Sequence, residues 1–87
     1  MNYYMAKSFI ETQRHEFKKA DKLRFIYKGY EYELRYEGGF GDFFGIYCRE
    51  QGRRNFKYFD GFSGVECASA NEVEEKFQAV VCKSNTK

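Results

Sequence analysis

The stretch Tyr30-Glu31-Tyr32-Glu33-Leu34-Arg35-Tyr36-Glu37 decides the fold of this chain. Aromatic or aliphatic residues alternate with charged residues through all of it, and this period of two is typical of a β-strand with one buried and one solvated face. The pattern predicts how the chain folds and carries no catalytic motif. Function therefore has to be argued from the surfaces that the fold leaves exposed.

The segment from Leu23 to Glu37 is predicted to form a β-hairpin that turns at Lys28-Gly29. A two-residue turn makes one face apolar and gives the other an opposite-charge pair, so pattern and turn favour the same register. Lysine is not a preferred first residue of a type I′ turn, which leaves the turn type open. The predicted pairs are Leu23 with Leu34, Phe25 with Tyr32 and Tyr27 with Tyr30 on the apolar face, and Arg24 with Glu33 and Ile26 with Glu31 on the other.

Two further strands are predicted, Phe43–Arg49 and Asn55–Phe59, with glycine-rich loops at Gly38–Asp42 and Asp60–Gly64. We prefer a three-residue turn around Gly52, because a turn shorter or longer by one residue would oppose two arginines. That turn pairs Cys48 with Phe56, Ile46 with Tyr58 and Glu50 with Arg54. The first four of these residues would then face the core, while Phe43, Tyr47 and Phe59 would face the other way, beside Arg49 and Lys57.

Two capping boxes predict helices at the ends of the chain. Ser69-Ala70-Asn71-Glu72 precedes apolar residues at i, i+4, i+7 and i+8, which are Val73, Phe77, Val80 and Val81. Ser8-Phe9-Ile10-Glu11 starts a second, less regular helix that runs to residue 22, although Met1–Ile10 also suits an edge strand. The predicted fold class is α+β, an antiparallel β-meander of three to four strands with an N-terminal helix and a C-terminal amphipathic helix in the order α-β-β-β-β-α.

The 87 residues are predicted to form one domain over 1–87, with 1–7 and 84–87 frayed. Ten Phe and eight Tyr supply the core, and such aromatic content argues against disorder. The net charge is only +2, but its sign alternates along the chain, being positive over 1–29 and 49–59 and negative over 30–48 and 60–87. This pattern fits ordinary solvated faces that attract one another, or a bipolar surface with a basic patch at Arg49–Lys57.

Cysteine usage and hydropathy predict a cytoplasmic protein. The three cysteines (Cys48, Cys67 and Cys82) are an odd number without a C-x-x-C pair, so no disulfide framework is expected. No basic stretch followed by an apolar run stands at the N-terminus, and no segment approaches the length of a membrane span. We expect no membrane association.

The sequence offers little for catalysis. His15 stands alone, and an H-E-x-x-H zinc motif would need histidine where Lys19 stands. The glycines of Gly39–Gly45 do not fit a phosphate loop, because a strand follows them in place of a helix. A Cys–His nucleophile pair stays an alternative, since such partners meet in space. We expect no enzyme, no cofactor and no metal.

The second sheet face supports three interpretations. Its aromatic rings interleave with Arg and Lys, which suits either protein hot spots or base stacking with phosphate contacts. The N-terminal helix could instead cover this face with Phe9, Ile10 and Phe17. An α-β-β-β-α order invites comparison with double-stranded RNA-binding domains, but those present a basic last helix, whereas this one starts with Glu72, Glu74 and Glu75. The small DNA- or RNA-binding domain is therefore the second choice.

The preferred hypothesis is a non-catalytic binding module that inhibits or regulates a larger host protein or nucleoprotein machine stoichiometrically. Proteins of this size and composition are similar, by analogy only, to products of phage and mobile elements, anti-CRISPR proteins included. A homodimer through an exposed sheet edge is a further alternative. The expected partner-binding residues are Phe40, Tyr47, Arg49, Arg53, Arg54, Lys57 and Phe59.

Overall fold

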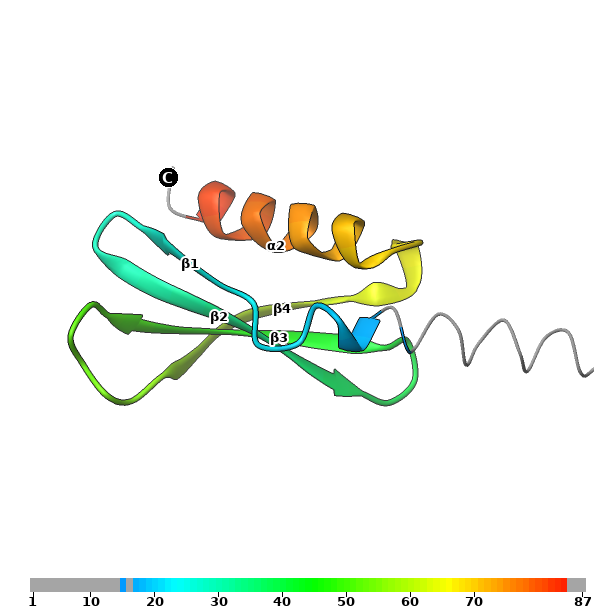
Figure 1. The fold of residues 1–87 in the computed structure, drawn as a ribbon, viewed down its shortest axis with the longest axis horizontal. Coiled ribbons are helices and arrows are strands. Elements are labelled where there is room, and N and C mark those ends of the chain that lie inside the picture. Colours follow the sequence, from blue (N-terminus) through cyan, green and yellow to red (C-terminus); the bar gives the residue numbers. More distant parts are fainter. Residues whose placement is uncertain (1–14, 16, 85–87) are drawn as a thin grey trace, which may run out of the picture.

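A four-stranded antiparallel sheet with one long helix packed on one face makes up the computed structural model, which describes residues 15 and 17–84 (Figure 1). The strands lie in the order β1-β2-β3-β4, so each pairs with its neighbour in sequence. This confirms the predicted meander and the C-terminal helix. The elements are β1 Arg24–Tyr27, β2 Tyr30–Gly38, β3 Phe43–Glu50, β4 Lys57–Ser63, the 3₁₀ helix η1 Gly64–Glu66 and α2 Ala70–Ser84.

The predicted N-terminal helix lies largely outside the described residues, as does the edge-strand alternative at 1–10. His15, Phe17 and Lys18 are helical and lead into a turn in which the Ala20 N–H donates to the Phe17 carbonyl. Phe17 and Ala20 are fully buried against the same sheet face as α2. The hypothesis that Phe17 covers the opposite face is therefore wrong.

The first hairpin forms in the predicted register. Phe25 pairs with Tyr32 and Arg24 with Glu33, as the alternating pattern requires. The turn is of type I′, because both central residues have positive φ, 52° at Lys28 and 84° at Gly29. Glycine is favoured at the second of these positions, since its missing Cβ removes the steric penalty of a left-handed backbone.

The last strand differs from its prediction by one residue of register near the turn and by two beyond a bulge, where Ile46 pairs with Asp60 and not with Tyr58. Cys48 pairs with Lys57 and not with Phe56, and β4 continues through the expected loop to Ser63. Because side chains alternate with a period of two, this slip turns Phe56 and Tyr58 away from the core. A bulge at Phe59, the extra residue between Tyr58 and Asp60, restores inward packing, so that Phe59 contacts Tyr32 with ring centroids 5.2 Å apart.

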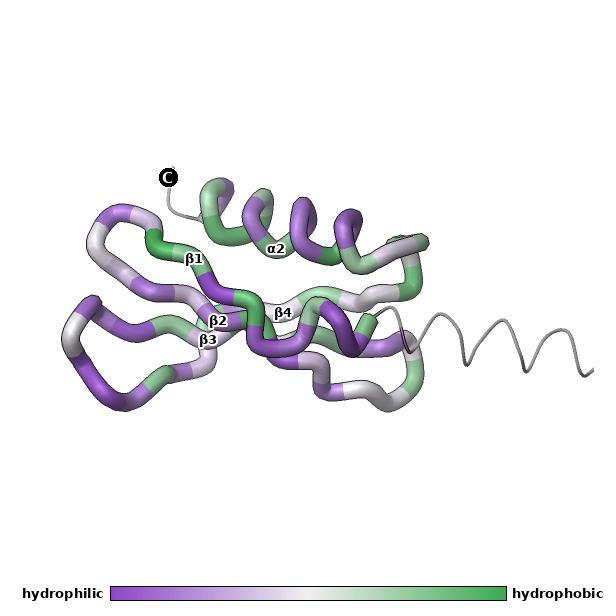
Figure 2. The backbone as a smooth tube through the Cα atoms, in the orientation of Figure 1, coloured by the Kyte–Doolittle hydropathy of each residue, from purple (hydrophilic) through white to green (hydrophobic). Residues whose placement is uncertain are grey.

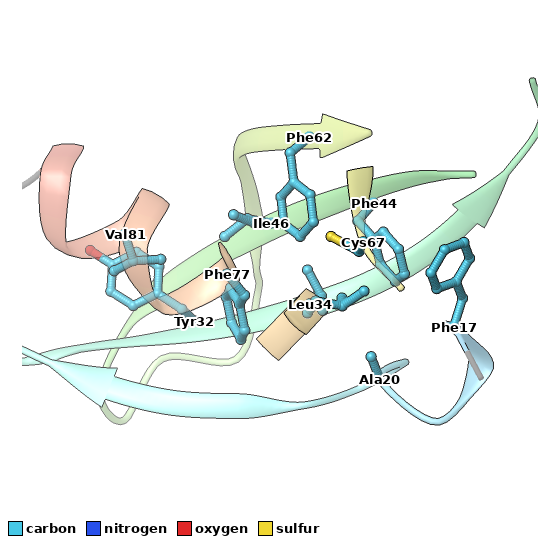
Figure 3. Close-up of a cluster of buried hydrophobic side chains, with 11 residues drawn as sticks. Phe17, Ala20, Tyr32, Leu34, Phe44, Ile46, Phe62, Cys67, Phe77 and Val81 are labelled. Atoms are coloured by element: carbon cyan, nitrogen blue, oxygen red, sulfur yellow. The ribbon is translucent and has the colours of Figure 1, made fainter. Parts of the chain in front are cut away.

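The core lies between the sheet and α2, and aromatic rings are its largest members (Figure 3). Phe44 is fully buried and packs edge-on against Phe17 and stacked against Phe62. The helix contributes the predicted stripe, in which Val73, Phe77 and Val81 are at most 1% exposed. At its start the Ser69 hydroxyl accepts a bond from the Glu72 N–H, and the Glu72 carboxylate accepts one from Ala68. The remaining members of the core are Ala20, Tyr32, Leu34, Ile46 and Cys67.

Candidate functional site

The sheet face opposite α2 carries a cluster of polar and aromatic side chains, two of which, Tyr47 and Arg49, are among the contact residues expected from the sequence. We call it the open face, because among the described residues no helix lies over it. Strand alternation and the pairing register place on it the odd-numbered residues of β2 and β3 and their neighbours in β1 and β4. Its side chains belong to Arg24, Ile26, Glu31, Glu33, Arg35, Glu37, Phe43, Tyr47, Arg49, Phe56 and Tyr58.

A buried carboxylate lies at the centre of the open face. Glu33 is 2% exposed and accepts hydrogen bonds from Arg24 Nε at 2.7 Å and from Arg35 Nε at 2.6 Å. Burial raises the pKa of Glu33, but the bonds from Arg35 and Arg24 outweigh it and hold the pKa below its ordinary value. The carboxylate therefore stays ionised and fixes two guanidinium groups in place.

Three guanidinium groups surround the ring of Phe56. The Cζ atoms of Arg49, Arg24 and Arg35 lie 4.2, 5.3 and 5.5 Å from its centroid, within the range of cation–π attraction. Arg49 is held in turn by Glu31, to whose Oε1 its Nε donates at 2.6 Å. Arginines that are already paired and stacked lose little side-chain freedom when a partner binds.

Tyr47 is fixed in a similar manner. Its hydroxyl donates to Glu37 at 2.7 Å, the Arg35 guanidinium lies 4.0 Å from its ring centroid, and Tyr58 packs edge-on against it. The hydrogen bond to Glu37 raises the pKa of Tyr47, because ionisation would set two negative charges together. Tyr58 is 60% exposed, so much of its side chain stays accessible on the open face.

The charges of the open face nearly cancel. The strands contribute three cations, Arg24, Arg35 and Arg49, and three anions, Glu31, Glu33 and Glu37. One further cation, the Lys22 ammonium, lies 4.0 Å from Glu33 Oε1. The face therefore combines ordered ion pairs with exposed apolar surface on Ile26 and Tyr58. Such a mixture is typical of protein interfaces, whereas a nucleic-acid site usually shows an excess of positive charge.

A hollow of about 760 Å³ lies inside the wide β3–β4 loop, at the end of the sheet where the β1–β2 turn also lies (Figure 1). We call it the loop hollow. The loop is largely hydrophilic (Figure 2) and is braced by bonds from the Gln51 N–H to the Gly29 carbonyl and from Arg49 to the Arg54 carbonyl. The lining comes from both sheet faces and consists of Tyr30, Cys48, Arg49, Glu50, Gly52, Arg53, Arg54, Asn55, Lys57, Tyr58 and Phe59.

The structure divides the predicted contact residues among three places. Five of them line the loop hollow: Arg49, Arg53, Arg54, Lys57 and Phe59. Tyr47 lies on the open face, and Phe59, expected there, points to the core side through its bulge. Phe40 lies at the opposite end of the sheet, because successive turns of a meander alternate between ends (Figure 1).

The loop that carries Phe40 is ordered by hydrogen bonds, while the Phe40 side chain is fully exposed. The Tyr36 hydroxyl donates to Asp42 Oδ1, and the Ser63 hydroxyl donates to the Gly41 carbonyl, both at 2.6 Å. The Gly64 N–H also reaches the Asp42 carbonyl at 2.9 Å. Phe40 is therefore held outwards on a braced turn and takes no part in the core.

Potential catalytic and metal-binding groups are scattered. Within residues 15 and 17–84, no three His, Cys, Asp or Glu side chains come close enough to hold a metal ion. Cys48, Cys67 and Cys82 form no disulfide with one another, and burial raises the pKa of Cys48, which lowers the thiolate population there. In the same part of the chain, no helix has the length and apolar character needed to cross a membrane.

Neither a protein-family model, nor a curated protein, nor a solved structure gives a significant match to this chain. Its function is therefore to be inferred from the geometry of the described residues.

Sequence reasoning missed the centre of the open face. Phe56 was expected in the core, and nothing in its neighbours signals the slip of register that turns it outwards. The pairing of Arg24 with Glu33 was predicted, but not the burial of Glu33. Opposite charges on neighbouring strands were the available signal. Arg24 pairs with Glu33, Arg49 pairs with Glu31, and Arg35 lies two residues along β2 from Glu33 and Glu37.

Proposed function

We propose that this chain is a non-catalytic binding module that recognises a larger protein through the open face and acts on it stoichiometrically, as an inhibitor or regulator. The observation that carries the proposal is the ordered cluster of Phe56 and three arginines on a nearly charge-balanced face. Arg, Tyr and Phe are enriched at protein interfaces, and residues held in place before binding give up less entropy.

Exposed apolar side chains beside this cluster support the same interpretation. Ile26 is 56% and Tyr58 60% exposed, and both lie on the open face. They supply surface that a protein partner can bury around the paired arginines, at about 25 cal/mol per Å² of apolar area. The Glu31, Glu33 and Glu37 carboxylates would oppose a phosphate backbone, which favours a protein over a nucleic acid at this face.

The proposal is tested by capture from host lysate with nuclease treatment. The tagged wild-type chain should retain a protein partner in equal amount with and without nuclease. The double variant Ile26→Ala/Tyr58→Ala should lose most of it, because truncating a hot-spot side chain at an interface costs about 2 kcal/mol or more. Val65→Ala is the matched control, since Val65 is 64% exposed but lies in η1, away from the open face. The proposal is contradicted if the double variant still captures the partner, or if only the Val65→Ala control loses it.

A second candidate function, direct binding of DNA or RNA, is favoured by the β3–β4 loop. Arg53, Arg54 and Lys57 are all exposed there. A nucleic-acid site built on them should weaken steeply with salt, by roughly 0.7–0.9 of a decade in affinity per decade of salt for each phosphate contacted. Loss of capture upon nuclease treatment, together with such a salt slope, would select this candidate over the first.

A further inference from the structure

The loop hollow has the size and order of a preformed site. Its volume of about 760 Å³ falls within the range of roughly 300–1,000 Å³ that is usual for ligand sites. Three hydrogen bonds hold the loop around it, from Gln51 to the Gly29 carbonyl, from Arg53 to the Glu50 carbonyl and from Arg49 to the Arg54 carbonyl. The loop around the hollow is therefore already ordered before a ligand binds.

Positive charge converges on this hollow without full compensation. The lining contains four cationic side chains and one acid, Glu50. Arg49 is neutralised by Glu31, and Arg53 lies 3.5 Å from the Glu50 carboxylate. Within residues 15 and 17–84, no ion pair involves the side chain of Arg54 or of Lys57. The free positive charge suits an anionic occupant.

Three aromatic residues line the hollow, and the two exposed ones, both tyrosines, suit a polypeptide occupant. Tyr30 is 41% and Tyr58 60% exposed, and both contribute to the lining. Tyrosines next to cations can accept apolar side chains that flank a carboxylate in a peptide. The cations are confined to the β3–β4 loop and the strand ends that flank it, and they adjoin the open face. A nucleic acid would need a longer basic track along its backbone.

We propose that the loop hollow binds an acidic segment of the partner protein, whose carboxylates pair with Arg54, Lys57 and Arg53. This inference rests on the proposed function and adds the chemistry of one contact. Because Tyr58 belongs to both surfaces, the segment would continue from the open face into the hollow. The cationic side chains already line one hollow before binding. The bound carboxylates would replace water there, and binding would require little further ordering of these side chains.

A deca-glutamate peptide is the probe, and NMR of the full chain is the readout. At low salt the peptide should shift signals of Gln51–Tyr58, the loop and the start of β4, and leave those of α2 unchanged. The variant Arg54→Gln/Lys57→Gln should bind about tenfold more weakly, as expected for two partly exposed ion pairs. The matched control Lys18→Gln/Lys76→Gln removes two charges elsewhere and should stay within about twofold of wild type.

Three results would overturn the inference: equal weakening in the control, shifts spread over the whole surface, or tighter binding of a ten-nucleotide oligo-dT at the same loop residues. The last would assign the hollow to nucleic acid. If the peptide fails to bind while the wild-type chain still captures a protein after nuclease treatment, the inference is wrong and the proposed function stands. If wild-type capture itself fails, the proposed function is wrong.

Discussion

At the scale of single residues, the Glu33 carboxylate holds two arginines of the open face, Arg24 and Arg35, in place. Its two arginine partners are part-exposed, with 49% of the Arg24 side chain and 34% of the Arg35 side chain accessible, while the Glu33 side chain is 3% accessible. Removing one member of such a cluster leaves the others without compensation, and this cost exceeds that of losing an exposed ion pair. The cluster therefore links the stability of the fold to the preparation of the binding surface.

This cluster predicts a loss of stability in acid. Because the folded-state pKa of Glu33 is lowered, its contribution is fully present above the unfolded pKa of about 4.3 and is lost as the pH falls through the folded value. Glu33→Gln should lower the free energy of unfolding at pH 7 by about 1–3 kcal/mol, and the gap to wild type should narrow below pH 4. Urea unfolding from pH 7 to pH 3 measures both effects. Glu50→Gln, at an exposed carboxylate, should match wild type throughout; a constant gap for Glu33→Gln would contradict the account.

Truncation of two phenylalanines four residues apart, Phe40 and Phe44, should change the free energy of unfolding by very different amounts. Phe40 is fully exposed, so Phe40→Ala should change the free energy of unfolding by less than about 0.5 kcal/mol. Phe44 is fully buried between Phe17 and Phe62, so Phe44→Ala should cost about 3–5 kcal/mol, enough to unfold much of a chain this small. Circular dichroism during thermal unfolding distinguishes the two. A large loss for Phe40→Ala would show that its loop packs elsewhere.

At the scale of an element, the first hairpin shows how much of a strand pairing can be predicted from the local sequence. The alternation of Tyr30–Glu37 and the turn at Lys28-Gly29 predicted every pair of β1 with β2. The register was predictable because a slip of one residue would bury charge and expose rings. The turn type was not, since lysine is uncommon in the left-handed conformation that Lys28 adopts.

The strain at Lys28 gives a prediction for the hairpin. Asparagine tolerates positive φ better than lysine or alanine, and Asn-Gly is the preferred type I′ pair. Both Lys28→Asn and Lys28→Ala lose the contact of Lys28 with the Tyr27 ring, but only alanine keeps the full backbone strain, so Lys28→Asn should be about 1 kcal/mol more stable than Lys28→Ala. Urea unfolding of both variants and of wild type gives this ranking. Equal stability of the two variants would mean that the turn relaxes without cost.

The last hairpin marks the limit of the same rules. Like-charge repulsion between Arg49 and Arg54 was the basis for a three-residue turn, but the structure solves that problem otherwise: Glu31 pairs with Arg49, and Arg49 donates to the Arg54 carbonyl. The partner on β2 is eighteen residues away, so no argument confined to the hairpin could supply it. The bulge at Phe59 likewise depends on packing against Tyr32.

At the scale of the whole molecule, the meander and the C-terminal helix follow from sequence patterns, whereas the binding surface depends on how strands align. The basic segment at Arg49–Lys57 was visible in the charge pattern, and most of it does line one hollow. Its separation from Phe40 follows only from topology, which sends alternate turns to opposite ends. The nearly neutral open face forms when three strands, β1, β2 and β3, bring acids and arginines together, and it cannot be predicted from composition alone.

Position-specific photo-crosslinking tests the central claim most directly. A photoreactive phenylalanine analogue is placed at Tyr58 on the open face or, as the control, at Gln78 on the exposed side of α2. After irradiation in nuclease-treated host lysate, the analogue at position 58 should crosslink to one defined protein, at one partner molecule per chain. The analogue at position 78 should form no crosslink. An adduct from position 78 alone, or one from position 58 that disappears with nuclease, would contradict recognition of a protein by the open face.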